Sequence, residues 1–295
     1  MRTIALGDPS YPPLLKEIHR PPGELHIEGT FLPEDIRAVA IVGTRSATPY
    51  GMKIAGQLAG QLAGRGMTVI SGLAEGIDTA AHRGALEAGG RTIAVVGHGL
   101  DFLYPAGNRR LAQEIIASGA LVSQFPLGVG PLKQNFPQRN RVIAGLSLGV
   151  VVIEAPERSG ALITAREALE EGREVFAVPG PISSAKHTGC HKLIQDGAKL
   201  VQSVDDILEE LAPVWDAEFA GADALLGPGT FDQACLAPGL FELLNAIPAG
   251  DAIGIEVLVQ RLKRPPQELL PQLTQLELQG AIQSVLSPGG YTRTL

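Results

Sequence analysis

The sequence predicts an α/β protein with a doubly wound, Rossmann-like parallel sheet, followed by a small C-terminal winged-helix domain. Over residues 38–201, short apolar and β-branched runs alternate with longer segments of helical periodicity. Continuous apolar runs are typical of parallel strands that helices cover on both faces. Glycine (36) and proline (22) are abundant without a strict period, which fits many tight turns between strands and helices.

The first 37 residues are expected to pack on the Rossmann domain, which we assign to residues 38–212. The predicted strands are 38–42, 67–70, 92–96, 121–122, 150–153 and 175–178. Small residues follow them, as in Gly43-Thr44-Arg45-Ser46 and Gly97-His98-Gly99. Because doubly wound sheets bind ligands beyond the carboxyl ends of their strands, we expect a binding site at this edge.

Composition indicates a globular protein without a membrane span. The chain has 295 residues, of which 45% are hydrophobic, enough for a large core and about two domains. No apolar run approaches the ~18 residues of a membrane helix, and no signal peptide is apparent at the N-terminus. Cys190 and Cys235 cannot form a disulfide framework, so we expect a reducing cytoplasm.

Nucleotide-cofactor motifs are missing from the sequence. Gly97-x-Gly99 is followed by Phe102 where a dinucleotide-binding loop has its third glycine. No Gly-Lys-Ser or Gly-Lys-Thr occurs, so a P-loop is absent as well. We therefore expect neither a dinucleotide cofactor nor an ATPase activity.

The segment from Lys133 to Arg141 is the strongest candidate for function. Its nine residues carry three positive charges, no negative charge and the aromatic ring of Phe136. Cations hold the phosphates of a single strand, and an aromatic face stacks on an unpaired base. The segment therefore indicates a single-strand binder. The alternative is a solvated loop whose Phe136 packs into the core.

A catalytic triad is the first of three other hypotheses. Ser71, Asp78 and His82 have the residue types of a triad, but no nucleophile elbow surrounds Ser71. Asp78 and His82 stand four residues apart on a predicted helix. We favour a surface hydrogen bond between them that fixes the preceding loop.

A metal site and a phosphate pocket are the other two. Half of a metal site is suggested by His187, Cys190 and His191. No second ligand pair lies nearby, so we expect an exposed loop and no metal.

A helix start is formed by Ser159, Gly160 and Thr164. Its amides can hold a phosphate, and the alternative is a capped helix without a ligand.

The acidity of the chain is concentrated in one segment. The net charge is −7, and residues 201–237 contain eight acidic residues and no basic one. We assign residues 213–237, which are rich in acidic residues, glycine and proline, to a linker.

Residues 238–295 resemble a winged helix. The predicted helices are 241–247, 254–262 and 267–279, before a hairpin over 282–291. The third helix has a leucine stripe and neither lysine nor arginine. It lacks the charges that anchor a recognition helix to phosphates, so we favour protein contact or packing over duplex recognition.

Several motifs together resemble the DNA-processing protein A family, also called Smf, whose members bind single-stranded DNA and load the RecA recombinase during natural transformation. The motifs occur in order over about residues 10–200 and are Val42-Gly43-Thr44-Arg45, the segment 71–82, Tyr104-Pro105 with Asn108, the segment 136–145, Ser159-Gly160-Ala161-Leu162 with Thr164-Ala165, and Pro179-Gly180 before Gly189. The resemblance implies a non-enzymatic protein without a cofactor or metal. Its implied partners are single-stranded DNA, RecA and a second copy of the chain.

From the residues and the resemblance together, we predict the following DNA-binding set: Gly43, Arg45, Ser46, Lys133, Gln134, Phe136, Arg139, Asn140 and Arg141. Arg45, Lys133, Arg139 and Arg141 are the expected phosphate contacts. A separate candidate phosphate pocket consists of Ser159, Gly160 and Thr164.

Two departures and two alternatives accompany the resemblance. The family's asparagine near Gly189 is replaced by His191, and its N-terminal SAM-like domain is expected to be absent.

One alternative is a nucleotide phosphoribohydrolase-like enzyme, because Thr164-x-x-Glu167 matches a motif of that group. Ile163, however, stands where that motif has a glycine, and its side chain would crowd a phosphate. The other alternative is a competence scaffold that does not bind DNA.

Overall fold

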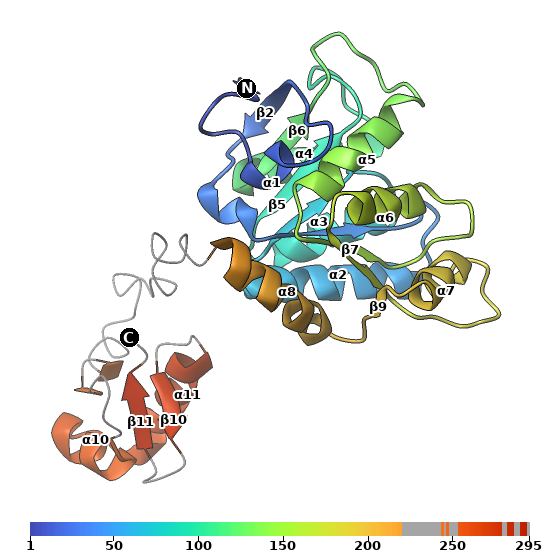
Figure 1. Ribbon diagram of the computed structural model, residues 1–295. Helices are drawn as coiled ribbons and strands as arrows, with labels where there is room; N and C mark the ends of the chain where they lie inside the picture. Colours follow the sequence, from blue (N-terminus) through green and yellow to red (C-terminus); the bar gives the residue numbers. More distant parts are fainter. Residues whose placement is uncertain (220–242, 245, 248–252, 279–281, 286–289, 294–295) are drawn as a thin grey trace. The chain divides into compact units, whose positions relative to one another are not determined.

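The computed structural model describes residues 1–219, 243–244, 246–247, 253–278, 282–285 and 290–293 (Figure 1). The chain divides into two compact units, Met1–Trp215 and Asp216–Leu295, and each is described by itself. Helix α8 (Val204–Phe219) continues beyond residue 212, so residues 213–219 of the predicted linker are helical. Residues 220–237 of that linker lie outside the described residues.

Among its described residues, the large unit contains a nine-stranded sheet in the order β1-β2-β6-β5-β4-β3-β7-β8-β9. The strands are β1 (Arg2–Ala5), β2 (Glu24–Gly29), β3 (Ala38–Val42), β4 (Thr68–Ser71), β5 (Thr92–Val96), β6 (Ala120–Ser123), β7 (Gly149–Val152), β8 (Glu174–Ala177) and β9 (Lys199–Leu200). Strands β3 to β9 pair in parallel, whereas β1 and β2 join antiparallel at the edge beside β6. The doubly wound class and all six predicted strands are confirmed. Sequence reasoning missed β1, β2 and β9.

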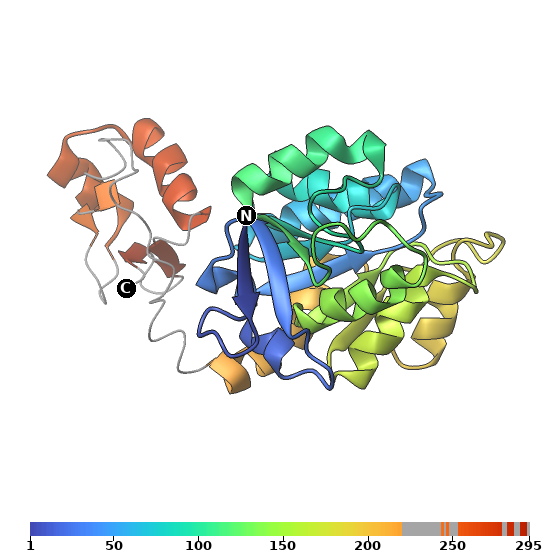
Figure 2. The same ribbon diagram turned by 90° about the horizontal axis from the view of Figure 1, so that it is seen from above.

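Helices cover both faces of this sheet (Figure 2). They are α1 (Pro13–Lys16), α2 (Pro49–Gly64), α3 (Ile77–Glu87), α4 (Arg109–Ser118), α5 (Asn135–Gly145), α6 (Gly160–Glu170) and α7 (Thr188–Gln195), with short 3-10 turns η1 (Pro33–Ile36) and η2 (Ala106–Asn108). Ile93 and Val95 of β5 belong to the core that includes residues of α1, α5, α6 and α7. Ala94 and Val96, on the opposite face, pack with residues of α4. Burial on both faces explains the continuous apolar runs.

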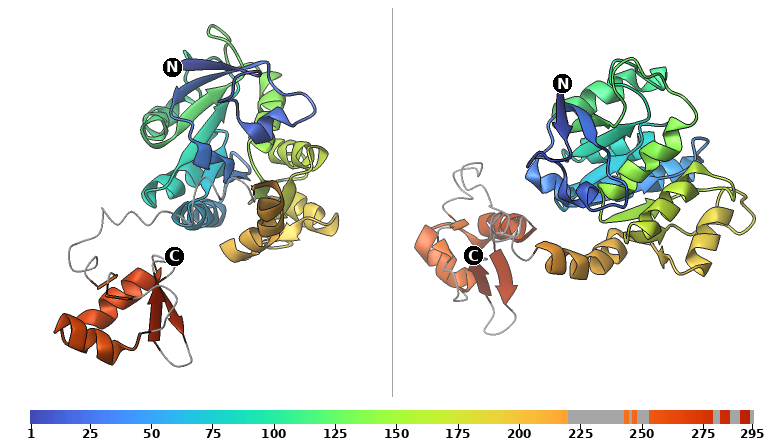
Figure 3. Two further views of the ribbon diagram at one scale, coloured as in Figure 1. Left: turned by 60° about the vertical axis from the view of Figure 1, so that its left-hand side comes forward. Right: turned by 45° about the horizontal axis from the view of Figure 1, so that its top comes forward.

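The small unit has the predicted winged-helix elements (Figure 3). Helices α10 (Ile255–Leu262) and α11 (Pro266–Leu278) agree with the prediction within about a residue, and β10 (Ile282–Val285) pairs antiparallel with β11 (Gly290–Arg293). Leu258, Leu269 and Leu273 lie in its core. The first predicted helix and the hairpin tip fall partly outside the described residues. No helix in the described part of the chain is both long and apolar enough to cross a membrane.

Candidate nucleic-acid interface

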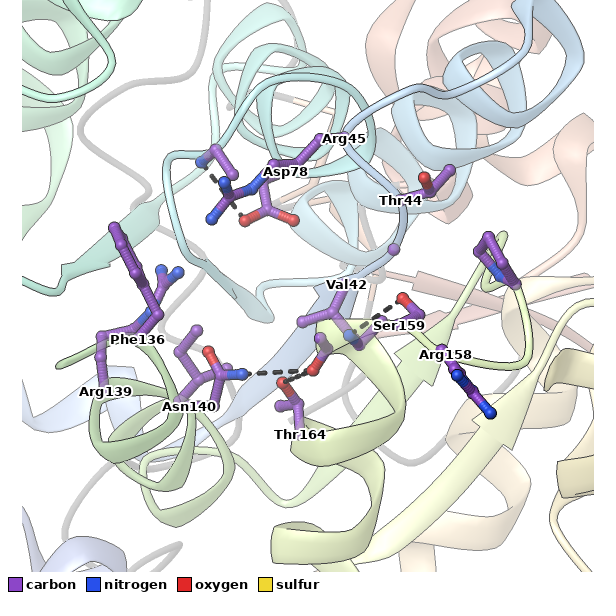
Figure 4. Close-up of a pocket in the computed structure, with 16 residues that line it drawn as sticks. Val42, Thr44, Arg45, Asp78, Phe136, Arg139, Asn140, Arg158, Ser159 and Thr164 are labelled. Carbon is purple, nitrogen blue, oxygen red and sulfur yellow. Dashed lines mark hydrogen bonds between the residues drawn. The ribbon is translucent and has the colours of Figure 1, made fainter. Parts of the chain in front are cut away.

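A pocket of about 300 Å³ opens at the carboxyl ends of β3 and β7, where the strand order reverses (Figure 4). From β3 the chain passes through β4, β5 and β6 in one direction, and β7 then lies on the other side of β3. Doubly wound sheets bind their ligands at such a switch point. The lining residues are Val42, Gly43, Thr44, Arg45, Ala74, Asp78, Phe136, Arg139, Asn140, Ile143, Pro156, Arg158, Ser159, Gly160, Ala161 and Thr164.

The loop after β3 carries Arg45 and is attached at both ends to Glu154, a fully buried residue that follows β7. The main-chain oxygen of Glu154 accepts the N–H of Thr44 at 2.7 Å. Its carboxylate accepts the N–H of Thr48 at 2.9 Å and also the Thr48 hydroxyl. That hydroxyl in turn caps α2 by accepting the N–H of Gly51 at 3.0 Å. Sequence reasoning missed this anchor.

Phe136 lies in the first turn of α5 and not in the solvated loop that was the alternative interpretation of its segment. The side-chain amide of Asn135 fixes the helix start by donating to the main-chain oxygen of Gly97 at 3.2 Å. The Phe136 ring is half-buried and packs on Gly97, where an added Cβ would lie 3.1 Å from the ring. Its centroid is 6.1 Å from that of Tyr104, at an interplanar angle of 46°.

Two arginines approach the Phe136 ring from different elements (Figure 4). The guanidinium carbon of Arg45, an exposed residue, lies 5.2 Å from the ring centroid, and that of Arg139 lies 5.9 Å away. Both distances fall in the range of cation–π contacts. Because Arg45 covers part of the ring, a base can stack there only if this exposed side chain moves aside.

Arg139 is buried, which argues against the prediction that it contacts phosphates. Its Nη1 donates to the main-chain oxygen of Val95 at 2.8 Å. Burial lowers the pKa of Arg139 to about 10, and the nearby Asp78 carboxylate opposes this shift. Burial raises the pKa of Asp78 in turn, and Arg139 opposes that shift. Arg139 therefore stays cationic at neutral pH and supports the ring of Phe136 from within the protein.

The other predicted DNA-binding residues do not all meet at the pocket. Arg141 lies two residues from Arg139 on α5, which turns it by about 200° around the helix, and its charge acts on Glu167 of α6. Lys133 and Gln134 are exposed just before α5, and Ser46 is exposed beside Arg45. These side chains are not among the residues that line the pocket.

The start of α6, predicted as a separate phosphate pocket, lines the same pocket as Arg45 and Phe136. The Ser159 hydroxyl caps the helix by accepting the N–H of Ala161 at 3.2 Å. The main-chain oxygen of Gly160 accepts from the Asn140 amide at 3.2 Å and from the Thr164 hydroxyl at 3.4 Å (Figure 4). Arg158, which sequence reasoning missed, adds an exposed cation next to this helix start.

A second, smaller pocket of about 140 Å³ lies beside the first. Arg45, Ala74, Phe136 and Arg139 line both pockets. The other lining residues of the second pocket are Gly72, Glu75, Val96, Gly97, His98, Tyr104 and Pro105. Phe136 and Arg45 therefore form a shared wall.

The predicted bond between Asp78 and His82 is not formed. Asp78 instead accepts the N–H groups of Gly72 at 3.1 Å and Ala74 at 3.3 Å, and in this way it does fix the loop after β4. His82 is fully buried and its Nδ1 lies 2.7 Å from the Thr92 hydroxyl. That hydroxyl donates to a main-chain oxygen at 2.7 Å, so it accepts from Nδ1–H of a neutral imidazole.

The segment with His187, Cys190 and His191 is not the exposed loop that we predicted. His187 and Cys190 are buried, and the His191 ring bonds to the main-chain oxygen of Gly180 at 2.9 Å. Nε2 of His187 lies 3.7 Å from the Glu154 carboxylate, and burial lowers the pKa of His187. Within the described ranges, no group of three or more histidine, cysteine or acidic residues could hold a metal ion.

Two family descriptions match the sequence. Residues 2–212 match DNA recombination-mediator protein A, and residues 235–290 match the DprA winged helix domain. Protein Smf of Escherichia coli is 45% identical over 287 residues, which cover 96% of this chain and 75% of that protein. DNA processing protein DprA of Streptococcus pneumoniae is 48% identical over 208 residues, covering 70% and 73% respectively.

Two solved structures share the fold of the large unit. DNA processing protein A from Streptococcus pneumoniae aligns with a TM-score of 0.67 at 46% identity, over 71% of this chain and 74% of that one. DNA processing protein A from Helicobacter pylori aligns with a TM-score of 0.64 at 29% identity, over 72% of this chain and 96% of that one. The Helicobacter structure was described for the single-stranded DNA binding mode of that protein.

Proposed function

The chain belongs to the DNA recombination-mediator protein A family, and we propose that it binds single-stranded DNA, protects it and loads RecA onto it in natural transformation and homologous recombination. The observation that carries the DNA-binding proposal is the pairing of exposed Arg45 with the half-buried ring of Phe136 at the switch point of the sheet. A cation and an aromatic face side by side are what a sequence-tolerant single-strand site requires. The Helicobacter relative, described as a single-strand binder, supports it.

In this proposal, Arg45 moves off the ring and contacts a phosphate while a base stacks on Phe136. Arg158 and the capped start of α6 lie across the first pocket and favour a neighbouring phosphate there. Lys133 and Gln134, exposed before α5, meet the strand outside the pocket. Arg139 acts as a positioning residue, because its guanidinium is already bonded within the protein.

The RecA contact, the homodimer and the cytoplasmic location rest on the family resemblance alone. The phosphoribohydrolase alternative has less support. The Thr164 hydroxyl is directed at the main-chain oxygen of Gly160, and Glu167 lies one turn further along α6, beside the charges of Glu170 and Arg141. We therefore propose a binding protein and not an enzyme. Incubation with AMP tests this, and release of adenine would contradict it.

Replacement of Phe136 tests the stacking site directly. We expect Phe136→Ala to weaken binding of labelled oligo-dT by about 1–3 kcal/mol at fixed salt. Tyr50→Ala is the matched control, because Tyr50 is 46% exposed but lines neither pocket. Equal affinities of parent and Phe136→Ala would refute the stacking role.

Replacement of Arg45 tests the phosphate contact. We expect Arg45→Ala to lower the slope of log affinity against log salt by about 0.7, the value for one single-strand phosphate contact. Arg110, with a side chain 91% exposed and placed on α4, is the control cation. An unchanged slope in Arg45→Ala would remove Arg45 from the site.

A further inference from the structure

The loop between β8 and α7, residues 178–187, brings a lysine against the loop that carries Arg45. The ammonium of Lys186 donates a hydrogen bond to the main-chain oxygen of Ser46, the residue after Arg45. Lys186 itself lines neither pocket. We propose that Lys186 is a further phosphate contact of the bound strand, on the β8 side of the first pocket. This inference rests on the proposed single-strand binding.

The order of the strands places three cations along one edge of the sheet. Strands β3, β7 and β8 are neighbours and run parallel. Each is followed at its carboxyl end by a loop with a basic residue, namely Arg45, Arg158 and Lys186. Because parallel strands end at the same edge of a sheet, a strand of DNA that leaves Arg45 in the direction of β8 meets these cations in turn.

The exposed carboxylates favour this direction. On the other side of β3, the loop after β4 presents Glu75, which is exposed and lies on the rim of the second pocket. A carboxylate repels phosphate oxygens. Toward β8, the exposed carboxylate of Glu157 is accompanied by two cations, Arg158 and Lys186. The balance of charge is therefore positive on the β8 side and negative at the loop after β4.

The charge of Lys186 is available to a ligand. Among the described residues it forms no ion pair with a carboxylate, and its bond to Ser46 goes to a neutral carbonyl. Lys192 on α7, by contrast, pairs with Asp196 at 2.8 Å. An ammonium has three donors, of which the carbonyl of Ser46 uses one. Lys186 is partly exposed and therefore retains two donors and its full charge for a phosphate.

The loop that carries Lys186 is held in one conformation by its own hydrogen bonds. The N–H of Ser184 donates to the oxygen of Pro181, and the N–H of His187 donates to the oxygen of Ser184, both at 3.0 Å. Nε2 of His191 bonds to the main-chain oxygen of Gly180 at 2.9 Å. A cation on an ordered loop loses less conformational freedom on binding than one on a mobile loop.

The two loops are joined to the same short segment after β7. The Glu154 carboxylate accepts the N–H of Thr48 and lies 3.7 Å from Nε2 of buried His187, the neighbour of Lys186. The next residue, Ala155, accepts the N–H of Gly189 at 2.8 Å through its main-chain oxygen. The fold therefore fixes the loop of Lys186 beside the loop of Arg45.

Removal of the charge tests the contact. We expect Lys186→Met to lower the slope of log affinity for oligo-dT against log salt by about 0.7, the value for one single-strand phosphate contact. The advantage of the parent then shrinks about 2.5-fold between 50 and 200 mM salt. Lys186→Arg should keep the parent slope. Lys192→Met is the matched control, because it removes the same charge on α7. Equal slopes in Lys186→Met and Lys192→Met would overturn the proposal.

A double variant distinguishes a phosphate contact from a brace. If Lys186 only held the loop through Ser46, its replacement would have no effect in Arg45→Ala, where the loop no longer carries the cation. We expect Lys186→Met to lower the slope by about 0.7 in that background as well, because the two cations contact different phosphates. An effect that disappears in Arg45→Ala would overturn the contact.

The outcomes separate this inference from the proposed function. If the parent does not bind oligo-dT, single-strand binding itself fails. If the parent binds and both Phe136→Ala and Arg45→Ala weaken binding, but Lys186→Met keeps the parent slope, only the contact with Lys186 fails.

Discussion

Replacing Glu154 by glutamine should weaken DNA binding although Glu154 lines neither pocket. Its carboxylate accepts both the N–H and the hydroxyl of Thr48, and its main chain accepts the N–H of Thr44. The loop between these residues carries Arg45. In Glu154→Gln the single carboxamide oxygen can replace only one of the two carboxylate oxygens, so either the N–H or the hydroxyl of Thr48 loses its acceptor.

The structure sets the size of this effect. A fully buried donor without an acceptor costs about 1–3 kcal/mol, and because Thr48 is only partly buried this range is an upper bound. If the loop keeps its position, the free energy of unfolding decreases by this amount, and Tm falls by about 2–4 °C per kcal/mol in a protein of this size. If the loop instead shifts to relieve the conflict, Arg45 leaves its position 5.2 Å from the Phe136 ring. Affinity then falls about tenfold for each 1.4 kcal/mol.

A double-mutant cycle distinguishes positioning from general destabilisation. Oligonucleotide affinity is measured by fluorescence anisotropy for the parent, Glu154→Gln, Arg45→Ala and the double variant. In the Arg45→Ala background the loop no longer carries the cation, so Glu154→Gln should change affinity less than about twofold. A loss as large in that background as in the parent would refute the positioning role.

Three further predictions concern the substrate, the small unit and pH. The protein should prefer a tailless single strand to a hairpin stem at moderate salt, because paired bases offer Phe136 no free face; competition titrations check this, and equal affinities would contradict it. Deleting residues 235–295 should leave the affinity for an oligonucleotide of one site's length within about tenfold of the parent's affinity. The cations and rings of the proposed site precede residue 200, and avidity between neighbouring molecules acts only on longer strands. A much larger loss would place DNA contacts in the small unit. Burial lowers the pKa of His82 from 6.5 in the unfolded chain to about 3 in the folded protein. Between these two values only the unfolded chain binds the proton, so the free energy of unfolding decreases as the pH falls below 6.5, by about 1.4 kcal/mol per pH unit. Denaturant titrations at pH 7.5 and 5.5 should give a smaller difference for His82→Asn, and an equal difference would contradict the buried neutral state.

The sheet was predictable because its strands are buried on both faces, which leaves a continuous apolar signal in the sequence. The edge strand β1 carries no such signal, because most of it is exposed, and in β2 the polar residues Glu24, His26 and Glu28 interrupt the apolar run. Helix α5 was missed for a different reason. Its first turns are polar and contain Pro137, and proline is tolerated in a first turn because no helical bond uses its nitrogen.

The sequence predicted most residues of the site, but not which of them are exposed to a ligand and which are buried and position their neighbours. Arg139 and Arg141 look equivalent in the sequence, yet a helix turns them to different sides. Only the fold shows that Asp78 and the main chain of Val95 meet the guanidinium of Arg139. Glu154 was invisible for the same reason, because 106 residues separate it from Thr48. Contacts between distant segments depend on how the strands are ordered, which local patterns do not encode.

Photo-crosslinking tests the central claim most directly, namely that the strand lies across Arg45 and Phe136 at the switch point of the sheet. A short oligonucleotide carrying one halogenated pyrimidine is irradiated with the full-length protein, and the modified peptides are identified by mass spectrometry. We predict crosslinks within residues 135–145 and within the segment that contains Tyr104, and we predict that Phe136→Ala abolishes the former. Crosslinks confined to residues 253–293, or to the surface of α2 and α3, would contradict the account.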